Sequence, residues 1–221
     1  MDRPARRTRG GEDQRWLPSA ERLKAFTDAI VAIAMTLLIL PLLDSVGEAA
    51  SEKLTTWEWL QADAAPILVF VLSFVIIANF WMTHHRVFSR VERVDEGLIW
   101  ITMAWALTIV WLPVATAVIG QMDTDDLQRV LYIGSMALTS TLQLLTRLHL
   151  RARPLLHDIP RDALQAGMLA DIVTTGLFLV SLVIALTVPG VGYAALFLMI
   201  LVGPVQAAGM RALRRRDPAG R

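Results

Sequence analysis

The 221-residue chain contains no cysteine. This absence excludes disulfide bonds, thiolate nucleophiles and every zinc or iron–sulfur site that requires cysteine ligands. Charged residues are also scarce, at 19%, whereas hydrophobic residues make up 55% and the mean hydropathy is +0.51. Soluble domains contain about 45–50% apolar residues. The composition therefore excludes a disordered chain and most soluble enzymes.

The sequence also lacks motifs that would indicate catalysis. It has no phosphate-binding loop, no H-E-x-x-H segment and no recognisable nucleophile triad. The adjacent His84 and His85 would point about 100° apart on a helix, so they are not spaced to ligate one metal ion. We therefore expect no enzyme activity, no resident metal and no cofactor.

Long apolar segments dominate the chain instead. A membrane-spanning helix needs about 20 mostly apolar residues, and six stretches of about that length occur between charged clusters. We expect the second to belong to a longer helix that begins near Trp57 and continues past His85, with Pro66 near its start. The pattern predicts an all-α integral membrane protein with six transmembrane helices, at residues 25–43, 64–83, 98–120, 127–146, 164–188 and 193–210.

The basic residues predict the orientation. Nineteen of the 21 lysine and arginine residues fall in the two terminal segments and in the second-to-third and fourth-to-fifth loops, which places these parts and both termini in the cytoplasm. This bias, together with attraction to membrane lipids, accounts for the arginine-rich ends without nucleic-acid binding. We predict a basic cytoplasmic segment at 1–21, a transmembrane domain at 22–213 and a basic cytoplasmic tail at 214–221. The opposite loops are acidic and either are solvated or gather cations at an outer mouth.

The first predicted helix carries a charge, Asp28, just inside its cytoplasmic end. A charge at this depth needs a partner, and Lys24 lies one turn away, while the helix N-terminus offers another favourable environment. Farther along, Ile33, Leu37 and Leu40 share one stripe with Thr36 beside them. Such a stripe faces lipid or a packing partner, or forms stacked apolar rings if several copies meet around an axis.

A second carboxylate, Asp171, lies inside the fifth predicted span. Asn79 and Gln143 are side chains of types that could pair with it. The sequence leaves a packing hydrogen bond and a proton relay as alternative roles for Asp171.

Two motifs resemble a known family. Arg22, Phe26, Thr27 and Asp28, followed by an apolar run, are similar to the R-x-x-x-F-S-D signature of the transmembrane protein 175 family of lysosomal and prokaryotic potassium channels. A second segment at the end of the next helix is similar to the family's W-x-x-H-H-R-x-F motif and contains Asn79, Trp81, His84, His85, Arg86 and Phe88.

The resemblance implies a homotetramer in the bacterial inner membrane, around a central pore lined by the first helix of each chain. It implies a constriction at Ile33, further apolar rings at Leu37 and Leu40, and a role in selectivity for Thr36. The signature residues, namely Arg22, Phe26, Thr27, Asp28, Asn79, Trp81, His84 and His85, would form a network that holds the first helix. The permeant ions would be potassium and other monovalent cations, with modest selectivity, because the chain lacks a T-V-G-Y-G filter.

The sequence departs from the family pattern at two places. Thr27 replaces the signature serine and keeps the hydroxyl, while Pro41 stands where an acidic residue is common and should end or kink the helix near Leu40. Asp44 would then be the nearest acidic substitute at the outer mouth. Alternatives to a potassium channel are a proton channel through the same pore, a secondary transporter that uses Asp28 or Asp171, and a non-conducting scaffold.

Overall fold

The structure is a computed structural model that describes residues 18–123 and 125–208. The described residues are mainly helical, with two isolated β-bridges between loops. The helices are α2 (Glu21–Leu37), α3 (Leu40–Ser51), α4 (Thr56–Ala62), α5 (Ala64–Phe88), α6 (Glu96–Gln121), α7 (Asp126–Ala152), η2 (Pro154–Leu156), α8 (Arg161–Thr187) and η3 (Gly192–Leu201). The predicted all-α class is confirmed.

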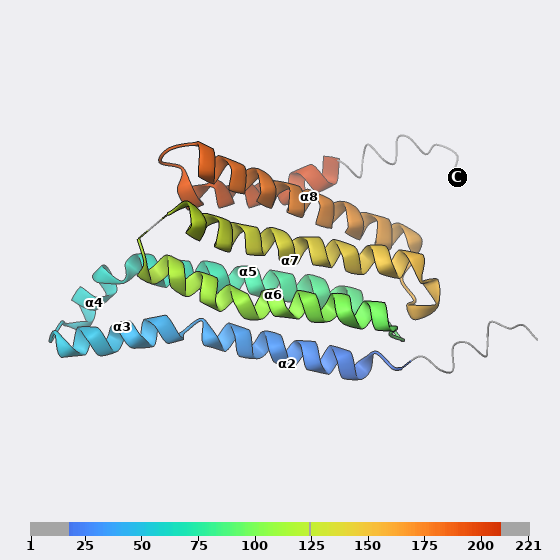
Figure 1. Cartoon of the computed structure of the whole chain (residues 1–221), viewed down its shortest axis with the longest axis horizontal. Helices are drawn as coiled ribbons and strands as arrows, with labels where there is room; N and C mark the ends of the chain where they lie inside the picture. Colours follow the sequence, from blue (N-terminus) through green and yellow to red (C-terminus); the bar gives the residue numbers. More distant parts are fainter. Residues whose placement is uncertain (1–17, 124, 209–221) are drawn as a thin grey trace, which may run out of the picture.

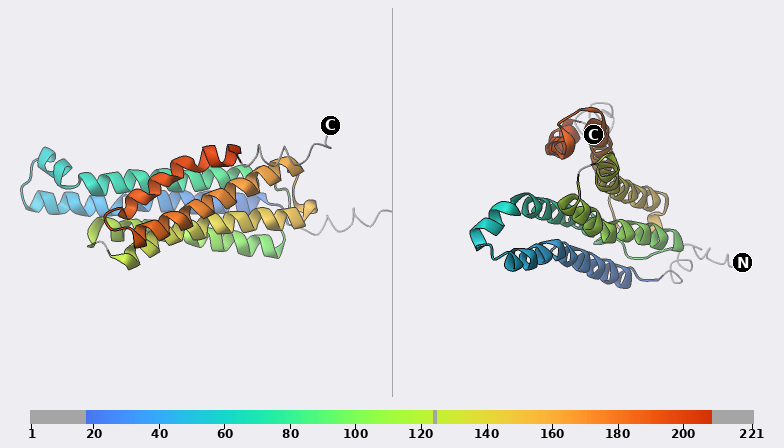
Figure 2. Two further views of the ribbon diagram at one scale, coloured as in Figure 1. Left: turned by 90° about the horizontal axis from the view of Figure 1, so that it is seen from above. Right: turned by 60° about the vertical axis from the view of Figure 1, so that its left-hand side comes forward.

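The long helices lie side by side along the long axis of the molecule (Figure 1). α2 packs on α5 and α6, α6 packs on α7, and α7 packs on α8. α8 and η3 therefore lie on the opposite side of the bundle from α2 (Figures 1 and 2). The α5–α6 and α7–α8 connections share one end with the start of α2, which we call the basic end; α3 and α4 lie at the other, acidic end.

The first predicted span is divided into two helices. α2 ends at Leu37, and α3 begins at Leu40 with Pro41 in its first turn. Pro41 has no N–H to donate to the Leu37 carbonyl, and the N–H groups of Leu42 and Leu43 both go to the Ile39 carbonyl. The helix interruption expected from Pro41 therefore lies at residues 38–39.

The expected helix from Trp57 past His85 is wrong at its start. Trp57 belongs to the separate helix α4, which begins with a capping box between Thr55 and Glu58, whereas α5 begins at Ala64. Pro66 is the reason, because it cannot donate to the Ala62 carbonyl and so interrupts the helix at Asp63. The continuation past His85 is confirmed, since α5 ends at Phe88.

By length and composition, four helices among the described residues could cross a membrane: Glu21–Ser51, Ala64–Phe88, Glu96–Gln121 and Arg161–Thr187. The fourth predicted span lies within α7, which is long enough but more polar. Residues 193–208 of the sixth lie in the shorter apolar helix Gly192–Ala208, and the last two residues of that predicted span lie outside the described residues.

The polar residues of α7 face the inside of the bundle. Gln128, Thr139, Ser140, Gln143 and Thr146 are buried, whereas leucines of the same helix are exposed. This arrangement is the reverse of a helix on the surface of a soluble protein. It explains why α7 has a low hydropathy although it packs between the apolar helices α6 and α8.

Loops at the basic end are tied to one another. β-Bridges join Ser19 to Arg93 and Val91 to His157, and the Ala20 N–H donates to the Glu92 carbonyl over 3.1 Å. A small apolar cluster, which includes Val91 and Leu156, packs beneath them. The start of α2 is therefore connected through the α5–α6 loop to the α7–α8 loop.

Candidate functional site: the exposed face of the first helix

The first helix has one buried face and one exposed face. Thr27, Val31 and Ala34 of α2 and Leu38 at its end are buried against α5 and α6. The predicted constriction residues lie on the exposed face, with exposed fractions of 60% for Ile33, 39% for Leu37 and 49% for Leu40. The chain thus leaves these apolar side chains uncovered, although the helix is packed on its other side.

Polar groups accompany this apolar stripe. Thr36 is exposed between Ile33 and Leu37, and its hydroxyl donates to the Ile33 carbonyl over 2.7 Å. Since the hydroxyl proton is used within the helix, the oxygen lone pairs remain free to accept from water or to meet a cation. Arg22 at the start of α2 and Asp44 in α3 are exposed as well.

Asp28 is held by the second helix of the signature. The Trp81 indole N–H donates to Asp28 Oδ1 over 2.8 Å, and His85 Nδ1 lies 3.9 Å from the same oxygen. The Trp81 and His85 rings are 5.3 Å apart. The expected partner Lys24 is wrong, because its ammonium group pairs with Glu21 at 2.7 Å. A capping position is also wrong, since α2 begins seven residues before Asp28.

His84 lies away from Asp28. Its imidazole is 2% exposed and stacks between Trp105, with centroids 3.9 Å apart, and Phe88, at 4.3 Å. The Gln143 amide lies near His84. The ring nitrogens of His84 and the amide atoms of Gln143 have no hydrogen-bond partner among the described residues. The adjacent histidines therefore have different environments, and it is His85 that approaches the first helix.

The remaining signature residues lie around this contact. Thr27 is buried, and its hydroxyl reaches the carbonyls of Leu23 and Lys24 at 3.1 and 2.9 Å. Phe26 is 52% exposed, and Asn79 is exposed on α5. The structure thus brings Asp28, Trp81 and His85 together, whereas His84 and Asn79 are not part of that contact.

The sequence analysis did not identify the partner of Asp171. Arg147 of α7 donates to the Asp171 carboxylate of α8 through Nε over 2.6 Å, and both side chains are almost fully buried. A Cβ atom at Gly167 would overlap the Arg147 guanidinium group, so glycine there leaves room for the pair. Arg147 directly follows the fourth predicted span and Asp171 lies inside the fifth, so opposite charges near the same end of consecutive spans could have suggested this pair.

Asp95, at the basic end outside the spanning segments, caps α6. It accepts from the Leu98 N–H over 2.8 Å and from His149 Nε2 at 2.8 Å, and Arg153 lies 3.8 Å away. Partial burial raises the pKa of Asp95, but the Leu98 N–H and the neighbouring His149 and Arg153 together lower it below its usual value. Asp95 thereby connects α6 to the end of α7.

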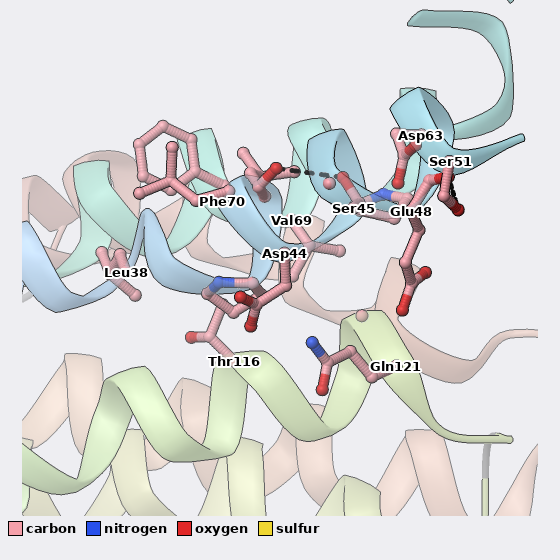
Figure 3. Close-up of a pocket in the computed structure, with 16 residues that line it drawn as sticks. Leu38, Asp44, Ser45, Glu48, Ser51, Asp63, Val69, Phe70, Thr116 and Gln121 are labelled. Atoms are coloured by element: carbon pink, nitrogen blue, oxygen red, sulfur yellow. Dashed lines mark hydrogen bonds between the residues drawn. The ribbon is translucent and has the colours of Figure 1, made fainter. Parts of the chain in front are cut away.

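A cavity of ≈ 890 Å³ opens at the acidic end between α3, α5 and α6. Asp44 and Glu48 of α3 lie across from Gln121 of α6, and Asp63 lies at the start of α5 (Figure 3). The walls toward the middle of the bundle are apolar and include Leu38 and Phe70. Asp44 and Glu48, which the sequence places in an acidic outer loop, thus belong to α3 and line this cavity.

Residues 22–113 match the family described as the endosomal/lysosomal potassium channel TMEM175. The chain is 34% identical over 109 residues to a potassium channel of Streptomyces collinus, a match covering 48% of this chain and 50% of that protein. It is 26% identical over 138 residues to the endosomal/lysosomal proton channel TMEM175 of Danio rerio, covering 62% of this chain and 26% of that protein. The matched part thus spans about half or less of these relatives.

The fold extends the likeness beyond the matched segment. The crystal structure of a lysosomal potassium-selective channel TMEM175 homologue from Chamaesiphon minutus superposes with a TM-score of 0.60 at 21% identity. This superposition covers 90% of the present chain and 98% of the other. The four helices able to cross a membrane mark a multi-pass membrane protein, which is similar to the TMEM175 family in sequence over residues 22–113 and in fold over most of the described chain.

Proposed function

We propose that the chain forms a potassium-permeable, modestly selective cation channel of the bacterial inner membrane. Four chains assemble around a central pore, each with six transmembrane helices and both termini in the cytoplasm. α2 and the start of α3 line the pore, and Ile33, Leu37 and Leu40 form its apolar constriction. The names of the relatives support ion permeation, and residues 22–113 contain the whole proposed pore helix.

The observation that carries this proposal is the exposed face of α2. A stripe covered by lipid would be expected to be purely apolar, whereas this face carries Thr36 within the predicted span 25–43 and continues to the charged residues Arg22 and Asp44 at its two ends. Charged and polar residues in a membrane face protein or water rather than lipid. The face therefore suits an aqueous axis, with apolar rings that interrupt the water column.

The acidic cavity supports a preference for cations over anions. Asp44 and Glu48 of α3 and Asp63 at the start of α5 place negative charge at the acidic end of the bundle, where they raise the local concentration of cations. In this role Asp44 replaces the acidic residue absent at position 41. Nothing in this arrangement supplies a ring of carbonyls for a dehydrated potassium ion, so we expect only modest discrimination between monovalent cations.

The assembly can be tested with a single introduced thiol, because the chain has no cysteine of its own. In Ile33→Cys, copies of the thiol meet at the axis, and mild oxidation should link chains into dimers on a denaturing gel. The matched control is Leu179→Cys, since Leu179 is comparably exposed but lies on α8, across the bundle from α2. Equal crosslinking of the two variants, or none in Ile33→Cys, would contradict the pore position of Ile33.

A proton channel is the second candidate, favoured by the vertebrate relatives that carry that name. The same pore would conduct both potassium ions and protons if water fills the apolar rings only transiently. Reversal potentials separate the two functions: a potential that follows the potassium gradient supports our proposal, and one that follows only the pH gradient supports the alternative. A coupled transporter based on Asp171 is disfavoured by the buried pair with Arg147.

A further inference from the structure

A second cavity lies at the basic end between α7 and α8. Its volume is ≈ 470 Å³, and its lining includes Arg151 from the end of α7 and Arg161 and Gln165 from the start of α8. The lining also contains Leu164, which begins the fifth predicted span, so the cavity lies at the depth of the lipid headgroups. Because α8 lies across the bundle from α2, the cavity is separate from the proposed pore (Figures 1 and 2).

Two of the arginines that line this cavity have no partner among the described residues. Arg147 and Arg153 at the same end contact Asp171 and Asp95, but Arg151 and Arg161 form no ion pair or hydrogen bond within the described residues. Two free arginines that line one cavity at the membrane surface match the way in which membrane proteins hold lipid phosphates.

The backbone adds donors of the same kind. α8 begins at Arg161 after Pro160, with no side-chain cap, so the N–H groups of its first turn lack intrahelical acceptors. Such a helix start favours a bound anion. His157 adds no charge to this set, since Nε2 contacts the Leu150 carbonyl at 3.0 Å and Nδ1 accepts from the Ile159 N–H at 3.0 Å, an arrangement that requires a neutral ring.

One carboxylate in the lining decides the type of lipid. Asp158 faces the same cavity, and its position is fixed by a hydrogen bond from its N–H to the Arg90 carbonyl, 2.9 Å long. A purely anionic headgroup would be repelled by Asp158, whereas a zwitterionic one places its phosphate at the arginines and its ammonium group at the carboxylate. We propose that this cavity binds the headgroup of phosphatidylethanolamine, with the phosphodiester at Arg151 and Arg161 and the ammonium at Asp158.

The proposal can be tested by native mass spectrometry of the full chain in detergent. Phosphatidylethanolamine and phosphatidylglycerol with identical acyl chains are titrated against the unchanged protein, and ethanolamine phospholipid should bind more tightly. Replacing both arginines by glutamine should weaken its binding about 25-fold, at about fivefold for each arginine near the membrane surface. Asp158→Asn should reduce the preference for ethanolamine over glycerol headgroups.

Arg153→Gln is the matched control, because it removes the same charge two residues from Arg151 but outside the cavity. Its lipid binding should equal that of the unchanged chain. If the double variant is not folded, Arg161→Gln alone provides the same test at an exposed position. Unaltered binding by the arginine variants, equal losses in Arg153→Gln, or equally tight binding of inorganic phosphate would each overturn the proposal.

Discussion

At the residue scale, the contact between Asp28 and the second signature motif explains how a charge is tolerated inside the first helix. The Trp81 N–H supplies a hydrogen bond to the carboxylate, and the His85 ring lies 3.9 Å from the same oxygen. The sequence predicted that Asp28 needs a partner but not which one. Lys24 was the nearest opposite charge along the helix, yet its long side chain reaches Glu21, which lies closer to the solvent-exposed start of α2.

We predict that Trp81→Phe lowers the stability of the protein, because it keeps an aromatic ring but removes the only N–H donor of the side chain. A hydrogen bond to a charged group contributes about 1.5–3 kcal/mol, and the partial exposure of Asp28 places the loss at the lower end. Thermal unfolding in detergent measures the effect. Trp100→Phe serves as control, since Trp100 is 67% exposed; equal losses in the two variants would argue against the Asp28 contact.

Asp95 gives a prediction about pH. The pKa of Asp95 is lower in the folded chain than in the unfolded chain. The stability that the carboxylate contributes is therefore fully present at a pH above its pKa in the unfolded chain, and it is lost as the pH falls through its pKa in the folded chain. Asp95→Asn keeps a good helix cap but loses the charge, and Asp95→Ala should cost about 1 kcal/mol more. The stability difference between the unchanged chain and Asp95→Asn should therefore be constant from pH 7 to 5 and shrink below about pH 4. A pH-independent difference would exclude a role of the carboxylate charge.

At the scale of the elements, hydropathy located the helices well and their interruptions less well. Pro41 predicts a break near Leu40 because proline ends or kinks a helix, and the interruption at residues 38–39 confirms it. Pro66 was underestimated, since a proline near a helix start is normally tolerated, and only the separate capping box at Thr55 shows that a shorter helix precedes it. α7 was identified as a helix although its buried polar residues make it less apolar than its neighbours.

The pair of Arg147 and Asp171 should act as a clamp between α7 and α8. Asp171→Asn leaves a buried guanidinium group without its counter-charge and should cost about 3 kcal/mol. Replacing both residues together, as in Arg147→Met with Asp171→Leu, should recover most of this loss. The comparison is made by thermal unfolding in detergent.

Gly167 provides an independent control of the clamp. Gly167→Ala should destabilise the unchanged chain, because the added methyl group displaces the Arg147 guanidinium from Asp171. In the Arg147→Met, Asp171→Leu background, the same change should have little effect. An equal cost of Gly167→Ala in both backgrounds would mean that the clamp does not require glycine at this position.

At the scale of the whole molecule, the charge distribution and the fold agree on one arrangement. The basic loops lie together at one end of the bundle and the acidic residues of α3 at the other, as expected from the positive-inside pattern. Apolar periodicity alone does not distinguish a helix face that meets lipid from one that lines a pore. The motifs at 22–28 and 81–88, together with the polar residues on the exposed face of α2, direct the proposal to that helix.

The measurement that tests the central claim most directly is ion flux from liposomes that contain the purified protein. Potassium, sodium and proton gradients are compared for the unchanged chain, Ile33→Asn and the control Leu179→Asn, which places the same polar group on the far side of the bundle. We predict that potassium moves faster than sodium, and that Ile33→Asn raises both fluxes several-fold because a polar ring wets the constriction. The control should match the unchanged chain. No flux of either ion in any version, or equal effects of the two substitutions, would contradict the account.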